Sequence, residues 1–487
     1  MAMNVLLITL DQFRGDCLSI AGHPVVKTPN LDRLCEHGVR LSRHYSQASP
    51  CSPGRASLYT GMYQMNHRVL ANGTPLDKGF DNIALTARRA GYTPTLFGYT
   101  DQSIDPRVTT GADDPRLQSY EGILPGFDCA LDLTRGMMPW REFLSEKGYD
   151  TSPGILQLLA TENERPVDVS VSNFLTNNLI DWIDAQDSAW FAHASFIRPH
   201  PPYSAAGEYS TMYAPDSVGQ PIQRAEEVHP FHEVMLMLDA TKAPTDPDEM
   251  AHMRAQYFGM ISEVDYQLGR LFDSLVESGE WDNTVIVITA DHAELLGDHG
   301  LREKVGYWET SQHIIGIVAD PRHASVHGTV VDKFTENIDI MPTLCEVMNI
   351  AIPSQCDGLP LTHFINGTEP PWWRDAAHWE YDWRFALIPA DRYVWPWRRR
   401  LEQLNLAVRR SDTHAYVQFG DGDFLCFDLE ADNTWRTLTT DAEVISENAR
   451  AMLTWRMEHA NRTLTGFLVE GGGIGRWPAN VEWRTES

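Results

Sequence analysis

The chain has 487 residues, of which 43% are hydrophobic and 22% are charged, and its formal net charge is −28. This length and composition are ordinary for a globular protein with a large core, so intrinsic disorder is not expected. The acidic excess argues against a nucleic-acid partner and against electrostatic docking to anionic membranes, because both attract basic patches.

The first apolar run, residues 5–10, stops at Asp11 and has no basic residues before it. We therefore expect a strand there rather than a signal peptide. No run approaches the length of a membrane span. Seven cysteines are scattered without a C-x-x-C pair, which favours neither a disulfide scaffold nor a cysteine-rich zinc site. These features predict a cytoplasmic protein with reduced thiols.

Short apolar runs predict buried parallel strands at residues 5–10, 95–97, 190–196 and 284–289. Helical patterns separate these runs. The longest pattern, at 249–280, repeats apolar residues at helical spacing and is most simply explained by core packing. Strands that alternate with helices predict an α/β fold with a doubly wound, mostly parallel sheet.

The composition changes after about residue 370, where tryptophan and arginine cluster at 372–374 and 395–400. Strand-like runs then flank a Gly-Asp-Gly-Asp turn at 420–423. We expect a catalytic α/β domain at 1–370 and a smaller C-terminal α+β region at 371–487. The tryptophan-rich part suggests packing against another subunit, so we expect a homo-oligomer, either a dimer or a tetramer.

Polar residues follow three of the predicted strands. Asp11 and Gln12 come after the first, Asp291 and His292 after the last, and His200 after the strand at 190–196. Taken singly, an Asp after a strand is often only a turn or a helix cap, and a lone His is usually structural. Because ligands bind beyond the carboxyl ends of parallel strands, the convergence of all three strands predicts a site at this edge.

The sequence C-S-P-G-R at 51–55 fits C-x-P-x-R, the pattern recognised by the machinery that oxidises cysteine to formylglycine. The hydrated aldehyde is a geminal diol. One hydroxyl, ionised by a metal, can attack sulfur or phosphorus. Pro53 suits the first turn of a helix at about 55–62, whose N-terminus favours anionic oxygen. Arg55 can hold the diol or the metal ligands by forked hydrogen bonds. The alternative is that Cys51 is a buried cysteine that begins a helix.

With these motifs the chain resembles the sulfatase family of the alkaline phosphatase superfamily. The matching stretches are N-V-L-L-I-T-L-D-Q at 4–12, C-S-P-G-R followed by A-S-L-Y-T-G at 51–61, D-H-A-E-L-L-G-D-H-G at 291–300 and L-C-F-D-L-E-A-D-N at 425–433. It is more similar still to the phosphonate monoester hydrolase and arylsulfatase subgroup, in M-N-H-R at 65–68, N-G-T-P-L-D at 72–77, G-Y-T at 98–100, R-P-H-P-P at 198–202 and H-W-E-Y-D at 378–382. The resemblance implies an alkaline phosphatase-like fold.

The resemblance also implies a metal site. Asp11, Gln12, Asp291 and His292 would bind one divalent ion together with modified Cys51. The oxygen ligands permit Ca²⁺, and the imidazole shifts the preference toward Mn²⁺. Maturation would require a formylglycine-generating enzyme as a partner.

Four further residues would surround the transferred group by the same resemblance: Asn72, Tyr99, His200 and Lys304. We expect His200 and Lys304 to act at the leaving group or at non-bridging oxygens, by donating a proton and by supplying positive charge. The structural alternatives are a turn for Asn72, core packing for Tyr99 and a surface ion pair for Lys304.

The chain departs from the usual sulfatase pattern at three places. It has G-Y-T-D at 98–101 where typical sulfatases have G-K-W-H, His292 where they have Asn, and Gly54 where Ser or Ala is commoner. The missing lysine and the added carboxylate of Asp101, which we expect to border the substrate, remove positive charge near the anion. This arrangement should penalise a dianion most.

We therefore expect a formylglycine- and metal-dependent hydrolase of small monoanionic esters, which cleaves sulfate esters and, in the same site, phosphonate monoesters and phosphodiesters. One alternative makes the phosphonate monoester or phosphodiester reaction the main activity. Another is a two-metal phosphatase or phosphodiesterase, although these normally use Ser or Thr as nucleophile. The last is a non-catalytic metal-binding protein with unmodified Cys51. We expect the leaving-group pocket to come from residues 109–120, residues 207–245 and the C-terminal region.

Overall fold

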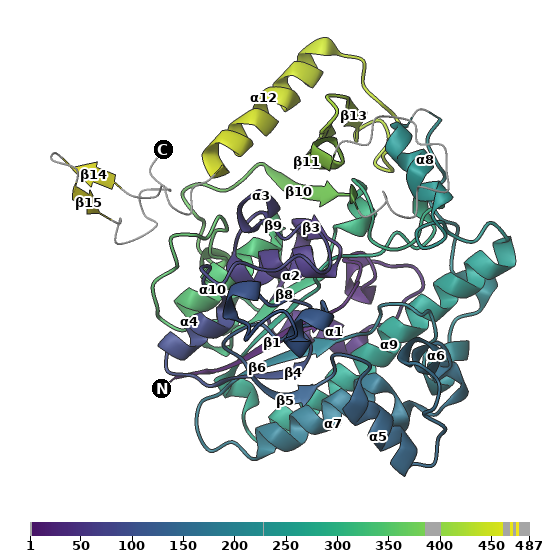
Figure 1. Ribbon diagram of the computed structural model, residues 1–487, viewed down its shortest axis with the longest axis vertical. Coiled ribbons are helices and arrows are strands. Elements are labelled where there is room, and N and C mark those ends of the chain that lie inside the picture. The colour runs from purple at the N-terminus through teal and green to yellow at the C-terminus, as the bar shows by residue number, and fades with distance from the viewer. Residues whose placement is uncertain (1, 227, 385–400, 461–467, 471–473, 477–487) are drawn as a thin grey trace.

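The computed structural model describes all residues except 1, 227, 385–400, 461–467, 471–473 and 477–487 (Figure 1). The arginine- and tryptophan-rich stretch at 395–400 thus lies outside the described residues. The strands are β1 Asn4–Leu10, β2 Val39–Tyr45, β3 Ala48–Ser49, β4 Pro94–Gly98, β5 Asp128–Asp132, β6 Phe191–Phe196, β7 Thr284–Thr289, β8 Gly316–Ala319, β9 Thr329–Glu336, β10 Ala376–Asp382, β11 Asn405–Ser411, β12 His414–Phe419, β13 Phe424–Asp428, β14 Leu468–Glu470 and β15 Ile474–Arg476.

The α-helices of the described chain flank these strands. They are α1 Pro29–Glu36, α2 Cys51–Thr60, α3 Gln64–His67, α4 Ile83–Arg89, α5 Met138–Glu146, α6 Ile155–Ala160, α7 Val171–Asp184, α8 Pro230–Met237, α9 Pro247–Glu277, α10 Ile340–Val347, α11 Thr362–Ile365 and α12 Ala442–His459. Among the described residues, no helix is both long enough and apolar enough to cross a membrane.

The main sheet has eight strands in the order β5-β4-β6-β1-β7-β8-β2-β9. All neighbours pair in parallel except β8, which runs antiparallel to both β7 and β2. The four predicted strands are all present, with bounds within one residue of those expected. The helix predicted at 249–280 is α9. The predicted α/β class with a mostly parallel sheet is confirmed.

Helices cover both faces of the main sheet. Side chains along a strand point alternately to the two faces, so each strand contributes to two cores. On β1, Leu6 and Ile8 join the core cluster that contains α1, α7 and α9. Val5 and Leu7 point the other way, into the cluster of α2, α4 and α10. Helices cover both faces (Figure 1), which explains why β1 is mostly apolar, with Asn4 and Thr9 as its polar residues.

Helix α2 begins at Cys51, about four residues before the predicted start. The predicted start was wrong because it placed the helix after Pro53. The first three N–H groups of a helix need no partner within it, so Pro53 fits equally well at the third position. The first helical hydrogen bond runs from Gly54 N to Pro50 O, at 3.1 Å. Cys51 therefore lies at the N-terminal end of α2.

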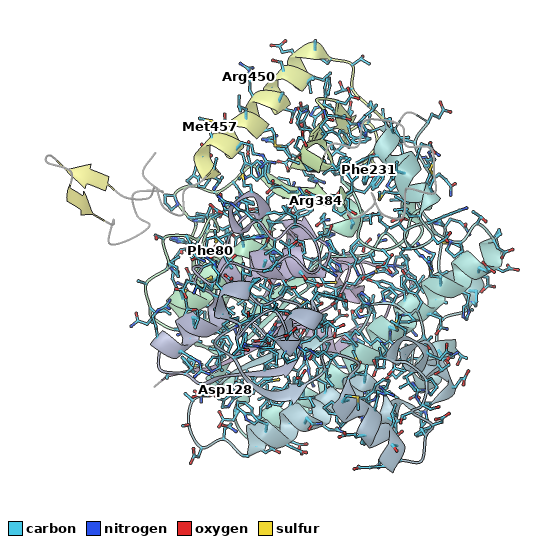
Figure 2. The ribbon with its side chains drawn as sticks, in the orientation of Figure 1. Phe80, Asp128, Phe231, Arg384, Arg450 and Met457 are labelled. Atoms are coloured by element: carbon cyan, nitrogen blue, oxygen red, sulfur yellow. The ribbon has the colours of Figure 1, made fainter. Side chains whose placement is uncertain are left out.

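A second sheet has the order β13-β12-β11-β10-β3 and is antiparallel except where β10 meets β3. Helix α12 lies over it, and Arg450 and Met457 mark the exposed side of that helix (Figure 2). The C-terminal part therefore mixes strands and helix. Strand β3 comes from residues just before α2, so this sheet is not built from the C-terminal part alone. The division at residue 370 stays a prediction.

Candidate active site

The carboxyl ends of β1 and β7 bring Asp11 and Asp291 together, since these two strands are neighbours in the sheet. Both residues are buried, with 1% and 0% of their surface exposed. The backbone N–H groups of Gln12 and His292 donate to Asp291 Oδ1 at 3.2 and 3.0 Å. The fold thus assembles the edge that the sequence predicts.

A group of four potential metal ligands lies at this edge: Asp11, Cys51, Asp291 and His292, with one ligand atom of each within 4.8 Å of the others. His292 Nε2 lies 3.3 Å from Cys51 Sγ and 3.4 Å from Asp291 Oδ2. Asp11 Oδ1 is buried and has no hydrogen-bond partner among the described residues. A buried carboxylate oxygen without a partner is costly, and a divalent cation would satisfy it.

The tautomer of His292 also fits a metal. Its Nδ1 lies 3.2 Å from the carbonyl oxygen of Ala293, so this nitrogen carries the proton and Nε2 presents a lone pair to the cluster. Burial, together with the nearby charge of Lys304, lowers the pKa of His292 well below its ordinary value. A neutral imidazole and two carboxylates form a donor set suited to Mn²⁺ or Ca²⁺.

Arg55 donates hydrogen bonds to both carboxylates, Asp11 and Asp291. Its Nη2 donates to Asp11 Oδ2 at 3.0 Å and its Nε to Asp291 Oδ2 at 3.1 Å. A third bond, from Nη1 to Ser195 Oγ, measures 2.8 Å, and the guanidinium carbon lies 4.4 Å from the centroid of the Tyr99 ring. The side chain has no exposed surface. Arg55 therefore balances two buried negative charges and fixes their orientation.

The thiol of Cys51 is poorly suited to be the nucleophile itself. Burial, and then the negative charge of Asp11, raise its pKa well above the ordinary value. It stays protonated at neutral pH, and the thiol is a weak nucleophile.

The glycine of the motif is explained by packing: a Cβ on Gly54 would lie 2.3 Å from the carbonyl oxygen of Asp291. Helix α2 therefore approaches the end of β7 as closely as backbone allows.

Tyr99 and Asn72 reach the site from β4 and from the loop after α3. Tyr99 donates its hydroxyl to Asp11 Oδ2 at 2.6 Å, so the residue does more than pack. Asn72 lies in a turn, and its Oδ1 accepts from Ser52 N at 2.9 Å. Gln102, which sequence reasoning missed, donates to the carbonyl of Ser52 at 2.9 Å. These bonds hold the start of α2 in place.

Lys304 is not a surface residue, since only 8% of it is exposed. Its Nζ lies 3.1 Å from Glu303, 2.7 Å from Gln12 Oε1 and 2.8 Å from His200 Nε2. The other ring nitrogen of His200 faces the carbonyl of Pro201 at 2.6 Å, so it is the protonated one. His200 Nε2 therefore accepts a hydrogen bond from the Lys304 ammonium.

The pKa shifts agree with this assignment. Burial and the charge of Lys304 lower the pKa of His200. Burial disfavours the charge on Lys304, but surrounding anionic groups outweigh it and raise the pKa well above its ordinary value. The Gln12 side chain lies between Lys304 and the carboxylate of Glu294. The role of Gln12 as a metal ligand stays a prediction.

A cavity of about 160 Å³ lies beside Cys51 and is lined by Asp11, Cys51, Asn72, Tyr99, Asp101, Tyr120, Glu121, Leu133, Gly136, Met137, Ile155, Leu156, Leu159, Ile197, His200, Pro201 and Lys304. Of the expected loops, 109–120 contributes Tyr120. No described residue of 207–245 or of the C-terminal region lines the cavity. The apolar wall comes instead from α6 and from residues 133–137.

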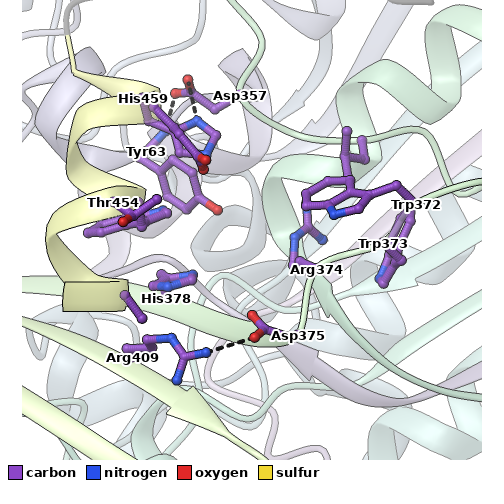
Figure 3. Close-up of a pocket in the computed structure, with 14 residues that line it drawn as sticks. Tyr63, Asp357, Trp372, Trp373, Arg374, Asp375, His378, Arg409, Thr454 and His459 are labelled. Carbon is purple, nitrogen blue, oxygen red and sulfur yellow. Dashed lines mark hydrogen bonds and ion pairs between the residues drawn. The ribbon is translucent and has the colours of Figure 1, made fainter. Parts of the chain in front are cut away.

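A second, larger cavity of about 790 Å³ lies between α12, β10 and the segment 372–375 (Figure 3). Two pairs of its charged groups bond to each other: Asp375 with Arg409 at 2.9 Å and Asp357 with His459 at 3.3 Å. It contains none of the four potential metal ligands and no cysteine. We therefore place the chemistry in the smaller cavity.

Comparison with known proteins agrees with this architecture. The solved structure of the phosphonate monoester hydrolase of Agrobacterium radiobacter has a TM-score of 0.87 and 38% identity, covering 98% of this chain and 100% of that one. The phosphonate monoester hydrolase from Silicibacter pomeroyi has a TM-score of 0.86 and 33% identity, covering 98% and 99%.

A relative known by sequence, the multifunctional alkaline phosphatase superfamily protein PehA of Trinickia caryophylli, is 34% identical over 513 residues, covering 97% of this chain and 98% of that protein. The sulfatase family model matches residues 3–350. The matched region contains every residue that we place in the site. The chain therefore belongs to the sulfatase family of the alkaline phosphatase superfamily.

Proposed function

We propose that this protein hydrolyses monoanionic esters, both sulfate esters and phosphonate monoesters, with an oxidised Cys51 as nucleophile. The observation that carries the proposal is the placement of Cys51. Its Sγ lies 3.3 Å from His292 Nε2, inside the group of potential metal ligands. A side chain that ends among metal ligands and also lines a cavity can attack a substrate held there.

The reaction begins from the hydrated aldehyde of formylglycine. One hydroxyl loses its proton and attacks sulfur or phosphorus, and the alcohol oxygen of the ester leaves and takes up a proton. The second hydroxyl then loses its proton, the carbon–oxygen bond to the transferred group breaks, and sulfate or phosphonate departs as the aldehyde reforms. Water adds back to the aldehyde. The plain thiol, whose pKa is raised, cannot support this cycle.

Asp11, Asp291 and His292 would hold one divalent ion together with the oxidised residue. When bound, the ion would stabilise the anionic form of the attacking hydroxyl. Arg55 keeps the two carboxylates in position through its bonds at 3.0 and 3.1 Å. Asn72 orients the start of α2 through Ser52 N. Each of these contacts fixes the nucleophile before the substrate arrives.

Lys304 and His200 would act at the leaving oxygen. The ammonium of Lys304 donates to His200 Nε2, so the proton available to a departing alkoxide resides on Lys304. His200 positions that ammonium and can pass a proton on. The fixed charge of Lys304 also stabilises negative charge on the transferred group.

The charge balance of the cavity favours a monoanion. Among the described residues, Lys304 is its only cationic lining side chain, and the acidic side chains of Asp11, Asp101 and Glu121 line the cavity too. A second negative charge on the substrate would meet these carboxylates at close range. We propose sulfate esters as the better substrates. Phosphonate monoester hydrolysis as the main activity is the second candidate, favoured by the similarity to two phosphonate monoester hydrolases of known structure.

Two measurements test the proposal. The peptide that contains Cys51 should be lighter by about 18 Da than its unmodified form. Matched nitrophenyl sulfate, phenylphosphonate and phosphate should then give kcat/KM values that are lowest for the phosphate. An unmodified Cys51 in an active protein would refute the nucleophile. A phosphate monoester as the best of the three would refute the charge argument.

Three further proposals accompany this function: maturation by a formylglycine-generating enzyme, a cytoplasmic location, and assembly into a dimer or tetramer. The seven cysteines are all free, which suits a reducing compartment. Elemental analysis of the purified protein would distinguish Mn²⁺ from Ca²⁺, and light scattering would give the assembly.

A further inference from the structure

Asp101 has a buried carboxyl group that lines the cavity beside Cys51 and lacks a side-chain partner among the described residues. Only 5% of Asp101 is exposed, and it lines the cavity. Within the described part of the chain, its oxygens make no hydrogen bond or ion pair with another side chain. Buried carboxylates are normally paired, because an unpaired buried charge loses its hydration without compensation. A ligand that supplies the missing partner would remove this cost.

Among the described residues, no cation forms a hydrogen bond or an ion pair with Asp101. The charge of Arg55 acts on it favourably, but the guanidinium is already bonded to Asp11 and Asp291. Burial raises the pKa of Asp101 to about 8, and the carboxylates of Asp11 and Glu121 add to this rise. Glu121 itself accepts one hydrogen bond, from the backbone of Arg135, and forms no ion pair with a described side chain. The cavity thus has two acidic groups that lack a positive partner among the described side chains. With a pKa of about 8, Asp101 is mostly protonated at neutral pH, and an ammonium bound beside it would favour its ionised form.

Asp101 and Lys304 reach the cavity from different strands. Asp101 follows β4, whereas Asp291 and Lys304 follow β7, and β6 and β1 lie between these two strands. Asp101 nevertheless lies close enough to Cys51 and Asp11 for their charges to act on one another. The acidic group of Asp101 therefore borders the cavity on its β4 side, beside Cys51.

A metal ion is a poor candidate for the partner of these acidic groups. The described residues contain only two groups of three or more possible metal ligands, and neither includes Asp101 or Glu121. The surrounding surface is apolar and aromatic instead: Met137, Ile155 and Leu159 line the cavity, and so does the partly exposed ring of Tyr120. The volume of about 160 Å³, part of which the transferred group would fill, limits the alcohol part of the ester to a compact group.

We propose that the alcohol part of the natural ester is a compact apolar or aromatic group that carries an amine, and that Asp101, assisted by Glu121, binds the ammonium. The substrate is then a zwitterion. Its anion lies toward the ligands at β1 and β7, its ring against α6, and its ammonium toward β4. The ring of Tyr120 can contribute a cation–π contact. This proposal rests on the hydrolase function proposed above and specifies its leaving group.

The test compares three aryl sulfates whose para substituents are aminomethyl, hydroxymethyl and carboxymethyl. We expect kcat/KM for the aminomethyl ester to exceed that for the hydroxymethyl ester by about tenfold or more, since a charged hydrogen bond is worth at least that factor. The carboxymethyl ester should be the slowest. Asp101→Asn should bring the aminomethyl-to-hydroxymethyl ratio close to one. Asp113→Asn, an exposed neighbour outside the cavity, should leave the ratio unchanged.

A second measurement needs no variant. Benzylamine should inhibit hydrolysis of nitrophenyl sulfate by the wild-type enzyme at about tenfold lower concentration than benzyl alcohol. Equal inhibition, or equal kcat/KM values for the aminomethyl and hydroxymethyl esters, would overturn the amine proposal while leaving the hydrolase function intact. If the matured, metal-loaded protein cleaves none of the three esters, the proposed function fails and this inference fails with it.

Discussion

Lys304 Nζ lies 2.8 Å from His200 Nε2, and the other ring nitrogen of His200 faces a backbone carbonyl. This pairing places the proton on the lysine and the lone pair on the histidine. The two residues form one unit, so each should depend on the other. Sequence reasoning assigned proton donation to His200, and the geometry now makes Lys304 the better donor.

Both His200→Ala and Lys304→Ala should slow alkyl sulfates about 100-fold more than nitrophenyl sulfate, because only poor leaving groups need a proton at departure. The measurement is a plot of log kcat/KM against leaving-group pKa. Lys147→Ala, at an exposed site at the end of α5, should reproduce the wild-type slope. Losses that are equal across the leaving-group series would remove both residues from this role.

Metal removal should abolish activity and lower the melting temperature, because Asp11 Oδ1 is buried and has no hydrogen-bond partner among the described residues. Added Mn²⁺ should restore both, with a stabilisation of about 2.7 kcal/mol at 100 times the Kd. Asp291→Asn should eliminate the Mn²⁺-dependent shift. Asp273→Asn, which alters only the exposed ion pair with Arg33, should keep it. A chelated protein with full turnover would contradict the metal site.

Arg55→Ala should destabilise the protein by about 3–5 kcal/mol, because it leaves two buried carboxylates without their cation. Arg33→Ala, at an exposed ion pair, should cost no more than about 1 kcal/mol. Urea unfolding measures both. Arg55 also belongs to the C-x-P-x-R motif, so the mass of the Cys51 peptide must be recorded for each variant. A small loss for Arg55→Ala would mean that the carboxylates are not held by this side chain.

The buried carboxyl of Glu263 should make the folding stability of the protein depend on pH. It lies buried between α7 and α9 and accepts from Ser170 Oγ at 2.7 Å and from Ser172 Oγ at 2.9 Å. Burial raises its pKa from 4.5 to about 7. Because the folded state holds this proton more tightly than the unfolded state, stability is lost as the pH rises from about 4.5 to about 7.

Glu263→Gln removes this titration and keeps groups that can bond the serines. The gain in unfolding free energy over the wild type should be larger at pH 8 than at pH 5 by about 2 kcal/mol. Glu277→Gln, at an exposed position on the same helix, should show no such difference. A gain that does not change with pH would show that the carboxyl stays ionised when buried.

Sequence reasoning found those parts of the site that depend on neighbouring strands. Asp11 and Asp291 were predictable because each follows a buried apolar run and parallel strands end at one edge. Lys304 was ambiguous, since the adjacent Glu303 looks the same in sequence whether the pair is buried or exposed. The motif at 51–55 indicated Cys51 as the candidate nucleophile, which the structure places beside the cavity, and only packing explains the glycine of the motif.

The wall of the cavity could not be predicted. Ile155 and Leu159 lie on a short helix whose apolar residues look like any core-facing set in the sequence. Nothing local indicates that this helix borders a cavity near Cys51, more than a hundred residues earlier in the chain. Gln102 is similar, because its one informative contact is with a backbone carbonyl of Ser52. Such contacts exist only after the chain has folded.

The burial of Cys51 limits the time during which this residue is accessible for oxidation. Only 4% of the residue is exposed, and the side chain that lies against it, His292, is 241 positions further along the chain. A ribosome adds about 5–20 residues each second, so this position stays uncovered for roughly 12–50 s of synthesis. An oxidising enzyme that needs an extended segment must act in that interval. Slower translation should thus raise the active fraction, and faster refolding should lower it.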